Sequence, residues 1–359
     1  MLKLLPVFWL LLAVAAAADS PKKSEPPKDP DIGDRIVQAA AYDGKLWLLG
    51  APVSKHDAFG SLVSIDLATG ARTLQDKAET IAIYRGPDDL WILRGEKDSS
   101  GELIVSRWKD GKLSKFASLS LKKGDAPIAI SQAGSSPLVM TSSWLNIWSS
   151  TSGDWKKVVL LNSKDAWGVS VTAASRDGKS LYVGFDRGEW GGGMIRIDLA
   201  TGARTAIEKR GVGLCEGDLN SDCDPVTGLI PDPGQDNCVI ASAGLSHFST
   251  WGRVLRVCGD EVSVIYKDEH IEHYPGGDFP VSVPFFALAP SPKGFWTVSY
   301  DKIYRFENDR LAQSFDFPKL ESMNGIWLSR AVPGLAVIRT DVNWGMSLSG
   351  YTPFVVSTE

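Results

Sequence analysis

Short apolar runs alternate with turn-forming residues along almost the whole chain. Each run spans roughly four to eight residues, and segments rich in Gly, Pro, Asp or Ser separate the runs, as in YDGKLWLLG at 42–50 and SPKGFWTVS at 291–299. The spacing typical of an amphipathic helix is nearly absent. The pattern therefore predicts a protein built from short β-strands that are joined by turns.

The turn-and-strand pattern recurs at a nearly constant interval. The recurring apolar strands start near Leu46, Leu90, Leu138, Leu181, Cys238, Phe295 and Leu335. Successive starts lie 44, 48, 43, 57, 57 and 40 residues apart. A period in the forties is typical of four-stranded sheets that are repeated around an axis. We therefore predict an all-β fold, a seven-bladed β-propeller of four-stranded antiparallel blades.

A duplicated segment supports the same repeat. SIDLATGART at 64–73 recurs as RIDLATGART at 196–205, which is 132 residues or three periods further on. Asp-x-x-Thr-Gly between two apolar strands predicts a turn, because Asp accepts hydrogen bonds from the backbone ahead of it and Gly tolerates positive φ. Each repeat then consists of three strands, this turn and a fourth strand.

Two motifs resemble those of known propellers. SRDGKSLYV at 175–183 resembles the Ser-Pro-Asp-Gly-x-x-Leu-Tyr-Val turn of periplasmic YVTN- and TolB-like propellers. The two IDLATGAR copies resemble the strand and turn of quinoprotein-type propellers. The resemblance implies a secreted or periplasmic β-propeller architecture, and it carries over no catalytic residue.

The first residues have the features of an export signal. A single basic residue, an apolar stretch and a run of alanines predict a signal peptide over 1–18. Residues 19–34 are rich in Pro and charge and predict a disordered linker. A single propeller domain is expected over 35–359. We therefore expect a secreted or periplasmic protein, with no membrane span in the mature chain.

Four cysteines in an exported chain predict two disulfides. Cys238 and Cys258 lie at equal distances from a hairpin turn expected near residue 248, so they should face each other across two strands. Cys215 and Cys223 bracket a short loop. The pairs Cys215–Cys223 and Cys238–Cys258 are therefore expected. The alternative is a long-range bridge that ties the 209–232 loop to the fifth blade.

The long connections are expected on one face of the disc. Alternating strand directions place the short DGK and ATG turns on one face and every long connection on the other. The longest connections are expected at 209–232 and 267–282, and 186–193 is a Gly-rich tip. All four histidines, including His56, map to this face, as do Trp144, Trp167, Trp190, Trp251 and Trp344. Long loops on a rigid scaffold are common binding surfaces.

This face supplies the candidate ligand-binding residues. They are Glu189, Trp190, His247, Trp251, His270 and His273. We expect a binding module for a protein, a glycan or a small polar ligand, centred on blades four to six. The alternative is an exported metal-dependent hydrolase or lyase that uses the Glu and His residues of this face as acid and base. No nucleophile motif such as Gly-x-Ser-x-Gly is present.

One acidic segment has the spacing of a calcium loop. Asp218, Asn220, Asp222 and Asp224 place oxygen ligands at alternate positions. Cys223 stands where such loops carry Gly, and Leu229 stands where they carry Glu. The sequence therefore leaves two alternatives: a calcium site, or a polar loop that a disulfide holds together.

The overall charge argues against one class of partner. The chain has 43 acidic and 38 basic residues, a net charge of −5. It therefore offers no basic surface with which to neutralise phosphates, and nucleic-acid binding is not expected. A monomer is expected.

Overall fold

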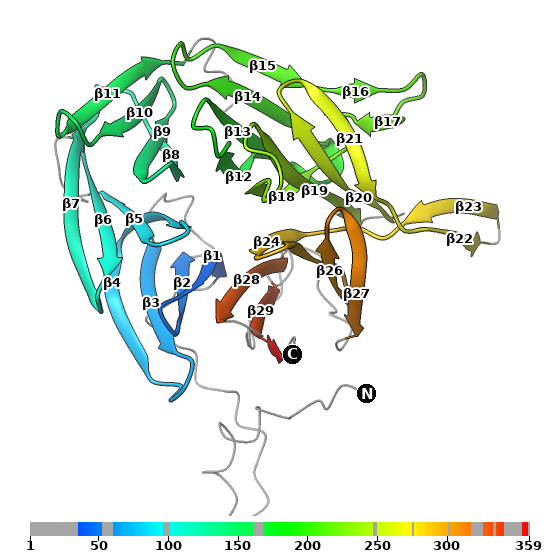
Figure 1. Cartoon of the computed structure of the whole chain (residues 1–359), viewed down its shortest axis with the longest axis horizontal. Coiled ribbons are helices and arrows are strands. Elements are labelled where there is room, and N and C mark those ends of the chain that lie inside the picture. The colour runs from blue at the N-terminus through cyan, green and yellow to red at the C-terminus, as the bar shows by residue number, and fades with distance from the viewer. Residues whose placement is uncertain are drawn as a thin grey trace, which may run out of the picture.

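The computed structural model describes residues 35–51, 60–95, 101–160, 168–246, 250–274, 276–300, 302–316, 326–332, 335–340 and 354–357. The expected signal peptide and linker lie outside the described residues. Within these ranges the ordered elements are β-strands, apart from one 3₁₀ turn, η2 (Gly188–Trp190). None of the described helical segments is long and apolar enough to cross a membrane. Figure 1 shows the sheets arranged around a common centre.

The first sheet contains seven strands rather than four. They are β1 (Arg35–Tyr42), β2 (Lys45–Ala51), β3 (Gly60–Asp66), β4 (Arg72–Arg85), β5 (Leu90–Gly95), β6 (Glu102–Lys109) and β7 (Lys112–Ser120), in that order. β4 is 14 residues long, and its first half pairs with β3 while its second half pairs with β5. Its sequence RTLQDKAETIAIYR contains no Gly or Pro to end the strand. Two repeats are therefore fused into one sheet.

The next sheets have the expected four antiparallel strands. They comprise β8 (Pro127–Ala133), β9 (Ser136–Thr141), β10 (Trp144–Ser149) and β11 (Asp154–Val159); β12 (Val169–Ala174), β13 (Ser180–Phe185), β14 (Met194–Asp198) and β15 (Arg204–Ile207); β18 (Val226–Pro231), β19 (Cys238–Ser246), β20 (Thr250–Cys258) and β21 (Glu261–Tyr266); and β24 (Ala287–Ser291), β25 (Gly294–Val298), β26 (Lys302–Glu307) and β27 (Arg310–Asp316). A last sheet holds β28 (Ile326–Val332), β29 (Leu335–Thr340) and β30 (Phe354–Ser357). The recurring strands predicted from the apolar pattern are all present.

The first strand of each repeat lies nearest the centre. β4 contacts both β1 and β8, β12 contacts both β8 and β18, and β24 contacts both β18 and β28. β28 also contacts β1, so the last sheet meets the first (Figure 1). These inner strands surround the axis, and the outer strands form the rim.

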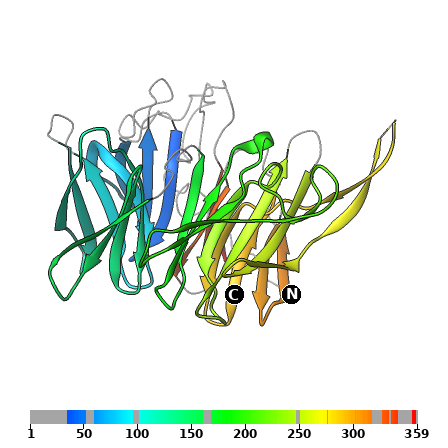
Figure 2. The ribbon, with the colours of Figure 1, turned by 90° about the horizontal axis from the view of Figure 1, so that it is seen from above.

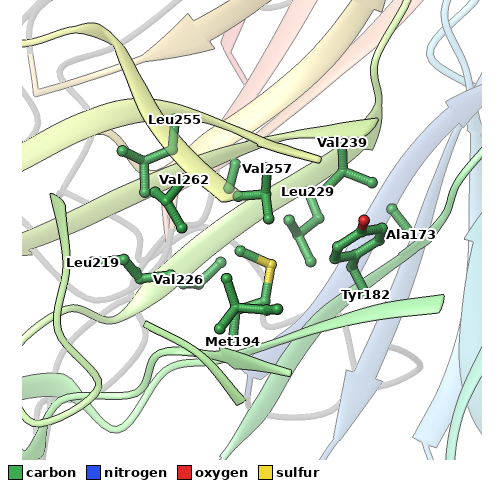
Figure 3. Close-up of a cluster of buried hydrophobic side chains, with 12 residues drawn as sticks. Ala173, Tyr182, Met194, Leu219, Val226, Leu229, Val239, Leu255, Val257 and Val262 are labelled. Carbon is green, nitrogen blue, oxygen red and sulfur yellow. The ribbon is translucent and has the colours of Figure 1, made fainter. Parts of the chain in front are cut away.

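Apolar side chains join neighbouring sheets face to face. In Figure 3, Tyr182 and Met194 pack against Leu229, Val239 and other apolar residues of the next sheet. Each of these side chains is buried. Full burial of a large apolar side chain contributes about 1.5–3 kcal/mol. The contact between sheets is therefore a principal source of stability.

The two copies of the duplicated segment fold in the same way. Asp66 Oδ1 accepts hydrogen bonds from the Thr69 amide and hydroxyl at 2.8 and 2.9 Å. Asp198 Oδ1 accepts the matching bonds from Thr201, both at 2.8 Å. Gly202 has a φ of +74°, which Gly adopts without strain. The predicted turn between third and fourth strands is confirmed.

Two predicted long loops contain strands. Residues 226–231 form β18, the innermost strand of its sheet, because VTGLIP is an apolar segment with one buried face. Residues 269–282 form a hairpin of β22 (Glu269–Tyr274) and β23 (Gly277–Ser282). The connections expected at 209–232 and 267–282 therefore include strands that the sequence pattern did not predict, because charged and turn-forming residues interrupt the apolar pattern there.

Both expected disulfides are present. Cys238 and Cys258 are directly opposite each other on β19 and β20, and their sulfur atoms are 2.00 Å apart. Cys215 and Cys223 are bonded at 1.99 Å. The alternative long-range bridge is therefore excluded.

Candidate functional site

The described connections differ in length between the two faces of the disc. Because neighbouring strands are antiparallel, the turns between first and second strands and between third and fourth strands share one face, called here the turn face. The remaining connections share the connection face. Three long segments lie there: the η2 loop (186–193), the stapled segment (208–225) and the arm, which is the β22–β23 hairpin (269–282).

The arm extends beyond the sheets. In both Figure 1 and Figure 2 the strands β22 and β23 reach outward from the side of the molecule that carries β20 and β21. β23 contacts β20 at the base of the arm. The arm is therefore fixed at one end only, and its outer part is presented to solvent.

The stapled segment has its own internal framework. β16 (Lys209–Arg210) pairs with β17 (Gly217–Leu219), and the Cys215–Cys223 disulfide closes the segment. The Asn220 side-chain amide donates to the Leu214 carbonyl at 2.9 Å. Leu219 is fully buried against the fifth repeat, which fixes the base. The residues between the two short strands therefore form a supported projection.

The η2 loop packs directly on the stapled segment. The Gly192 amide donates to the Ser221 carbonyl at 2.9 Å, and the Gly193 amide donates to the Asp224 carbonyl at 2.7 Å. A Cβ atom at Gly193 would lie 2.6 Å from the Ser221 Cβ, closer than such atoms approach. The Gly-rich sequence of this loop is thus explained by backbone contact, which leaves Trp190 at the outside.

β20 links the stapled segment to the arm. The Trp251 indole N–H donates to the Cys223 carbonyl at 3.1 Å, and Arg253 Nη1 donates to the Gly217 carbonyl at 3.0 Å. At the neighbouring Gly252 the amide donates to Ser282 Oγ, at the base of the arm, at 2.9 Å. The three connections are therefore joined by an uninterrupted series of contacts.

Buried and half-buried charges hold the stapled segment. Asp224 is fully buried and pairs with Arg253. Burial raises the pKa of Asp224, and the charge of Arg253 opposes this. Hydrogen bonds from Arg210 lower the pKa of Glu208, and Arg210 also pairs with Asp222 at 2.6 Å. The carboxylates of Asp224 and Glu208 are therefore both paired with arginine side chains of the protein itself.

Exposed apolar side chains gather on the three connections. The large apolar side chains most exposed to solvent are Trp190 (72%), Val212 (104%), Leu214 (85%), Ile271 (53%) and Phe279 (50%). Other exposed apolar residues are only 39–47% exposed: Val159, Val264 and Leu311 lie on outermost strands of the sheets, and Leu74 lies in the first half of β4. An outermost strand has one solvent-facing side, so its partial exposure is expected. Trp190, Val212 and Leu214 lie outside the strands and are far more exposed, while Ile271 and Phe279 lie on the two-stranded arm and are slightly more exposed.

The predicted calcium ligands have other partners. Asp218 pairs with Lys209 at 2.6 Å, and Asn220 Oδ1 accepts the Asp222 amide at 3.0 Å. Asp222 and Asp224 pair with Arg210 and Arg253 respectively. In the part of the chain that the structure describes, no three His, Cys, Asp or Glu side chains group as metal ligands. Of the two alternatives, this geometry supports the disulfide-held polar loop.

The candidate histidines are separated. His270 and His273 lie on β22, and because they are three positions apart on a strand they point to opposite sides. His273 Nδ1 is 2.7 Å from Asp278 on β23, while His270 Nε2 is 3.7 Å from Glu272. His247 and His56 lie outside the described residues. His270 and His273 are therefore not brought together, and each lies beside an acidic residue of the arm.

The remaining predicted residues have different surroundings. Glu189 is exposed beside Trp190 in η2, and Trp251 is half-buried with its N–H used internally. Trp144 is half-buried, with the Lys122 ammonium 4.3 Å from its ring centre. Trp167 and Trp344 lie outside the described residues. Sequence reasoning missed Val212, Leu214, Ile271 and Phe279, although an apolar residue inside a polar, Gly-rich connection is a usable signal.

A cavity occupies the centre of the ring. Its volume is about 1160 Å³, and the inner strands β1, β4, β8, β12, β18 and β24 line it. Most of its lining is apolar, including Ile83, Ile130 and Leu229, while Arg176 lies at its turn-face end. Arg176 is engaged there by Asp236 at 2.9 Å and by the Pro233 carbonyl at 2.6 Å.

Comparison with known proteins identifies the class of fold. No protein-family model and no curated protein sequence matches the chain. A chain in the crystal structure of a mitotic checkpoint complex aligns with a TM-score of 0.51 and 10% identity, covering 89% of this chain and 93% of that one. YCF48 bound to a D1 peptide gives a TM-score of 0.50 and 12% identity, covering 86% and 89%.

A further neighbour is the β-propeller domain of the Trilobed protease from Pyrococcus furiosus. It gives a TM-score of 0.49 and 9% identity, covering 90% of this chain and 95% of that one. The chains that align with TM-scores of 0.51 and 0.50 are β-propellers, so the propeller resemblance inferred from the sequence is confirmed. At these identities the likeness extends to the fold alone.

Proposed function

We propose that this propeller is a binding module that docks another protein on its connection face, in the region of repeats four to six. The observation that carries the proposal is the gathering of the most exposed apolar side chains on the η2 loop, the stapled segment and the arm. Exposed apolar patches on soluble proteins commonly mark interaction sites. Propeller folds are consistent with such a role.

A protein fits this surface better than a glycan or a small polar ligand. The five apolar residues are spread over three separate connections, and none of them lines the central cavity. Small ligands usually occupy a concave site that buries most of their surface. Protein interfaces instead combine a few apolar anchors with a polar rim.

We further infer a ring of seven blades in an exported protein. Seven inner strands, β1, β4, β8, β12, β18, β24 and β28, follow one another around the axis, and β28 contacts β1. The two disulfides support an oxidising compartment, because disulfides persist mainly outside the cytosol. Secretion or transfer to the periplasm would follow from a signal peptide over 1–18.

Site-specific photocrosslinking in the producing cells tests the docking surface. A photoreactive amino acid replaces Trp190, Val212 or Ile271 in one set of variants and Val159, Val264 or Leu311 in a matched set. We expect discrete crosslinked products, identified by mass spectrometry as the same partner, from the first set only. Equal products from both sets, or none from the first set, would contradict the proposal.

A further inference from the structure

We propose that the partner segment is a basic polypeptide with apolar side chains, and that Val212 and Leu214 of the stapled segment are its anchors. This inference rests on the proposed function and adds the chemistry of the partner. Val212 and Leu214, in the projection between β16 and β17, would contact apolar side chains of the partner. The nearby carboxylates would favour a partner with positive charge.

The projection is ordered before any partner arrives. Val212 and Leu214 are almost fully exposed, so burial of their side chains does not fix their position. The backbone is held instead by the Cys215–Cys223 disulfide and by the bond from Asn220 to the Leu214 carbonyl. The Gly213 amide also donates to Glu216 Oε2 at 2.9 Å. A preorganised apolar anchor binds with a smaller loss of conformational entropy.

The segment that carries the anchors has an excess of acidic residues, and so does the arm. The stapled segment has five acidic residues, of which Asp224 is buried and paired with Arg253, and its two basic residues, Lys209 and Arg210, pair with other acids of the segment. Residues 267–282 add four acidic residues against Lys267, which pairs with Glu269. The surplus is therefore carboxylate, although the net charge of the whole chain is only −5.

Lysine and arginine suit this combination of groups. Their long apolar stems cover apolar surface while the charged ends remain in water. Such a stem could lie on Leu214 while its cationic end approaches the surplus carboxylates. An anionic lipid surface would be repelled by the same charge, so the surface favours a basic polypeptide over a membrane.

Three short synthetic peptides serve as probes. One alternates Lys and Leu, one alternates Lys and Ser, and one alternates Glu and Leu, so that charge and apolar content are separated. Binding to the intact, oxidised protein is measured by fluorescence anisotropy. We expect the Lys–Leu peptide to bind at least about tenfold more tightly than the other two, because it satisfies both features of the surface.

The double variant Val212→Ser, Leu214→Ser is expected to weaken Lys–Leu binding by about tenfold or more, as loss of anchors does. The matched control Val264→Ser, Leu311→Ser should leave it unchanged. Circular dichroism and the Tm check that both variants fold. Equal binding of the Glu–Leu or the Lys–Ser peptide would overturn the proposed partner chemistry, and equal binding by the anchor variant would overturn the assignment of the anchors.

The two proposals fail in different ways. If crosslinks form at the connection positions but the peptides are not distinguished, the docking surface stands and the basic partner is wrong. If no crosslinks form there, the docking surface itself is wrong, whatever the peptides do.

Discussion

Apolar packing joins the repeats in both halves of the ring, but the polar contacts that accompany it differ. From β1 to β11, aromatic rings meet between neighbouring repeats: Trp47 and Trp108 lie 4.7 Å apart between the first two, and Phe116 and Trp148 lie 5.1 Å apart between the second and third. The Trp108 indole N–H donates to Asp43 Oδ2 of the first repeat at 2.8 Å. Among the described residues, the η2 loop, the stapled segment and the arm lie in the other half.

From β12 to β27, Arg–carboxylate pairs join the repeats. Arg196 pairs with Asp260 at 2.7 Å and Arg256 pairs with Asp309 at 2.5 Å, each across two sheets. Arg176 reaches Asp236 in the same way. All three carboxylates lie in turns of the turn face, opposite the η2 loop, the stapled segment and the arm.

In the second half, the Arg–carboxylate pairs between repeats lie at the turn face, apart from the connection face. Ion pairs at the turn face hold neighbouring repeats together at one edge, so the connections at the other edge need only close the chain. In the aromatic half the rings fill the space between sheets, and stability depends on shape. In the second half, substitutions on the connection face should therefore affect binding without affecting stability.

The largest effect is expected in the aromatic half. Trp91 is fully buried and its indole N–H donates to Gln132 Oε1 at 2.9 Å. Trp91→Ala should lower the free energy of unfolding by about 4 kcal/mol through lost burial and the cavity it leaves. Urea denaturation measures this. Trp190→Ala, at the exposed tip, is the control and should change stability by less than about 0.5 kcal/mol.

The Cys238–Cys258 disulfide should give the next largest effect. Replacing both residues with Ser is expected to cost about 3 kcal/mol, because the link restricts the unfolded chain between residues 20 apart. Hydrogen exchange should show faster opening of β19 and β20 while β5 and β6 keep their protection. Equal loss of protection in both halves would show that the ring opens as one unit.

Arg256 tests whether ion pairs support the second half. Arg256→Met leaves Asp232, whose side chain is 1% exposed, without its cation. The expected loss lies near the lower end of the roughly 3–5 kcal/mol typical of a broken buried pair. Arg196→Met is the control, since Asp260 is 58% exposed and such pairs contribute at most about 1 kcal/mol. A similar loss in both variants would contradict the assigned difference in burial.

The turns that contain Asp66 and Asp198 predict a small pH dependence of stability, which should be the same for both turns. Hydrogen bonds from Thr201 lower the pKa of Asp198, and those from Thr69 lower the pKa of Asp66. A carboxylate with a lower pKa in the folded state adds stability above its unfolded pKa of about 3.9, and this is lost as the pH falls through the folded value. The Tm advantage of wild type over Asp198→Asn or Asp66→Asn should therefore shrink below about pH 4. If the two variants differed in how their Tm depends on pH, the surroundings of each turn rather than its hydrogen bonds would determine the pH dependence.

Removal of divalent ions should have no effect. The side chains of Asp218, Asn220, Asp222 and Asp224 are engaged by Lys209, Arg210, Arg253 and a backbone amide. We expect EDTA to leave the Tm unchanged, as measured by differential scanning calorimetry. A Tm that fell with EDTA and recovered with added calcium would restore the calcium site considered from the sequence.

The sequence predicts the sheets better than the surface. Turn residues and apolar runs locate the recurring strands because strand burial is periodic, and Cys238 and Cys258 follow from hairpin symmetry. The fusion of two repeats through β4 was not predicted, since it depends on pairing of both halves of one strand with different neighbours. The apolar residues Val212 and Leu214 stand out in a Gly-rich connection, but their exposure depends on which side chains the tertiary structure leaves uncovered.

The continuous strand β4 has a mechanical consequence. A single 14-residue strand passes from the rim of the first repeat to the centre of the second without an intervening loop, so backbone hydrogen bonds run across their boundary. These two repeats should tilt as one rigid plate. Any breathing of the ring must then occur at the later boundaries, where successive sheets are linked by connections, and the projecting arm and stapled segment would amplify it.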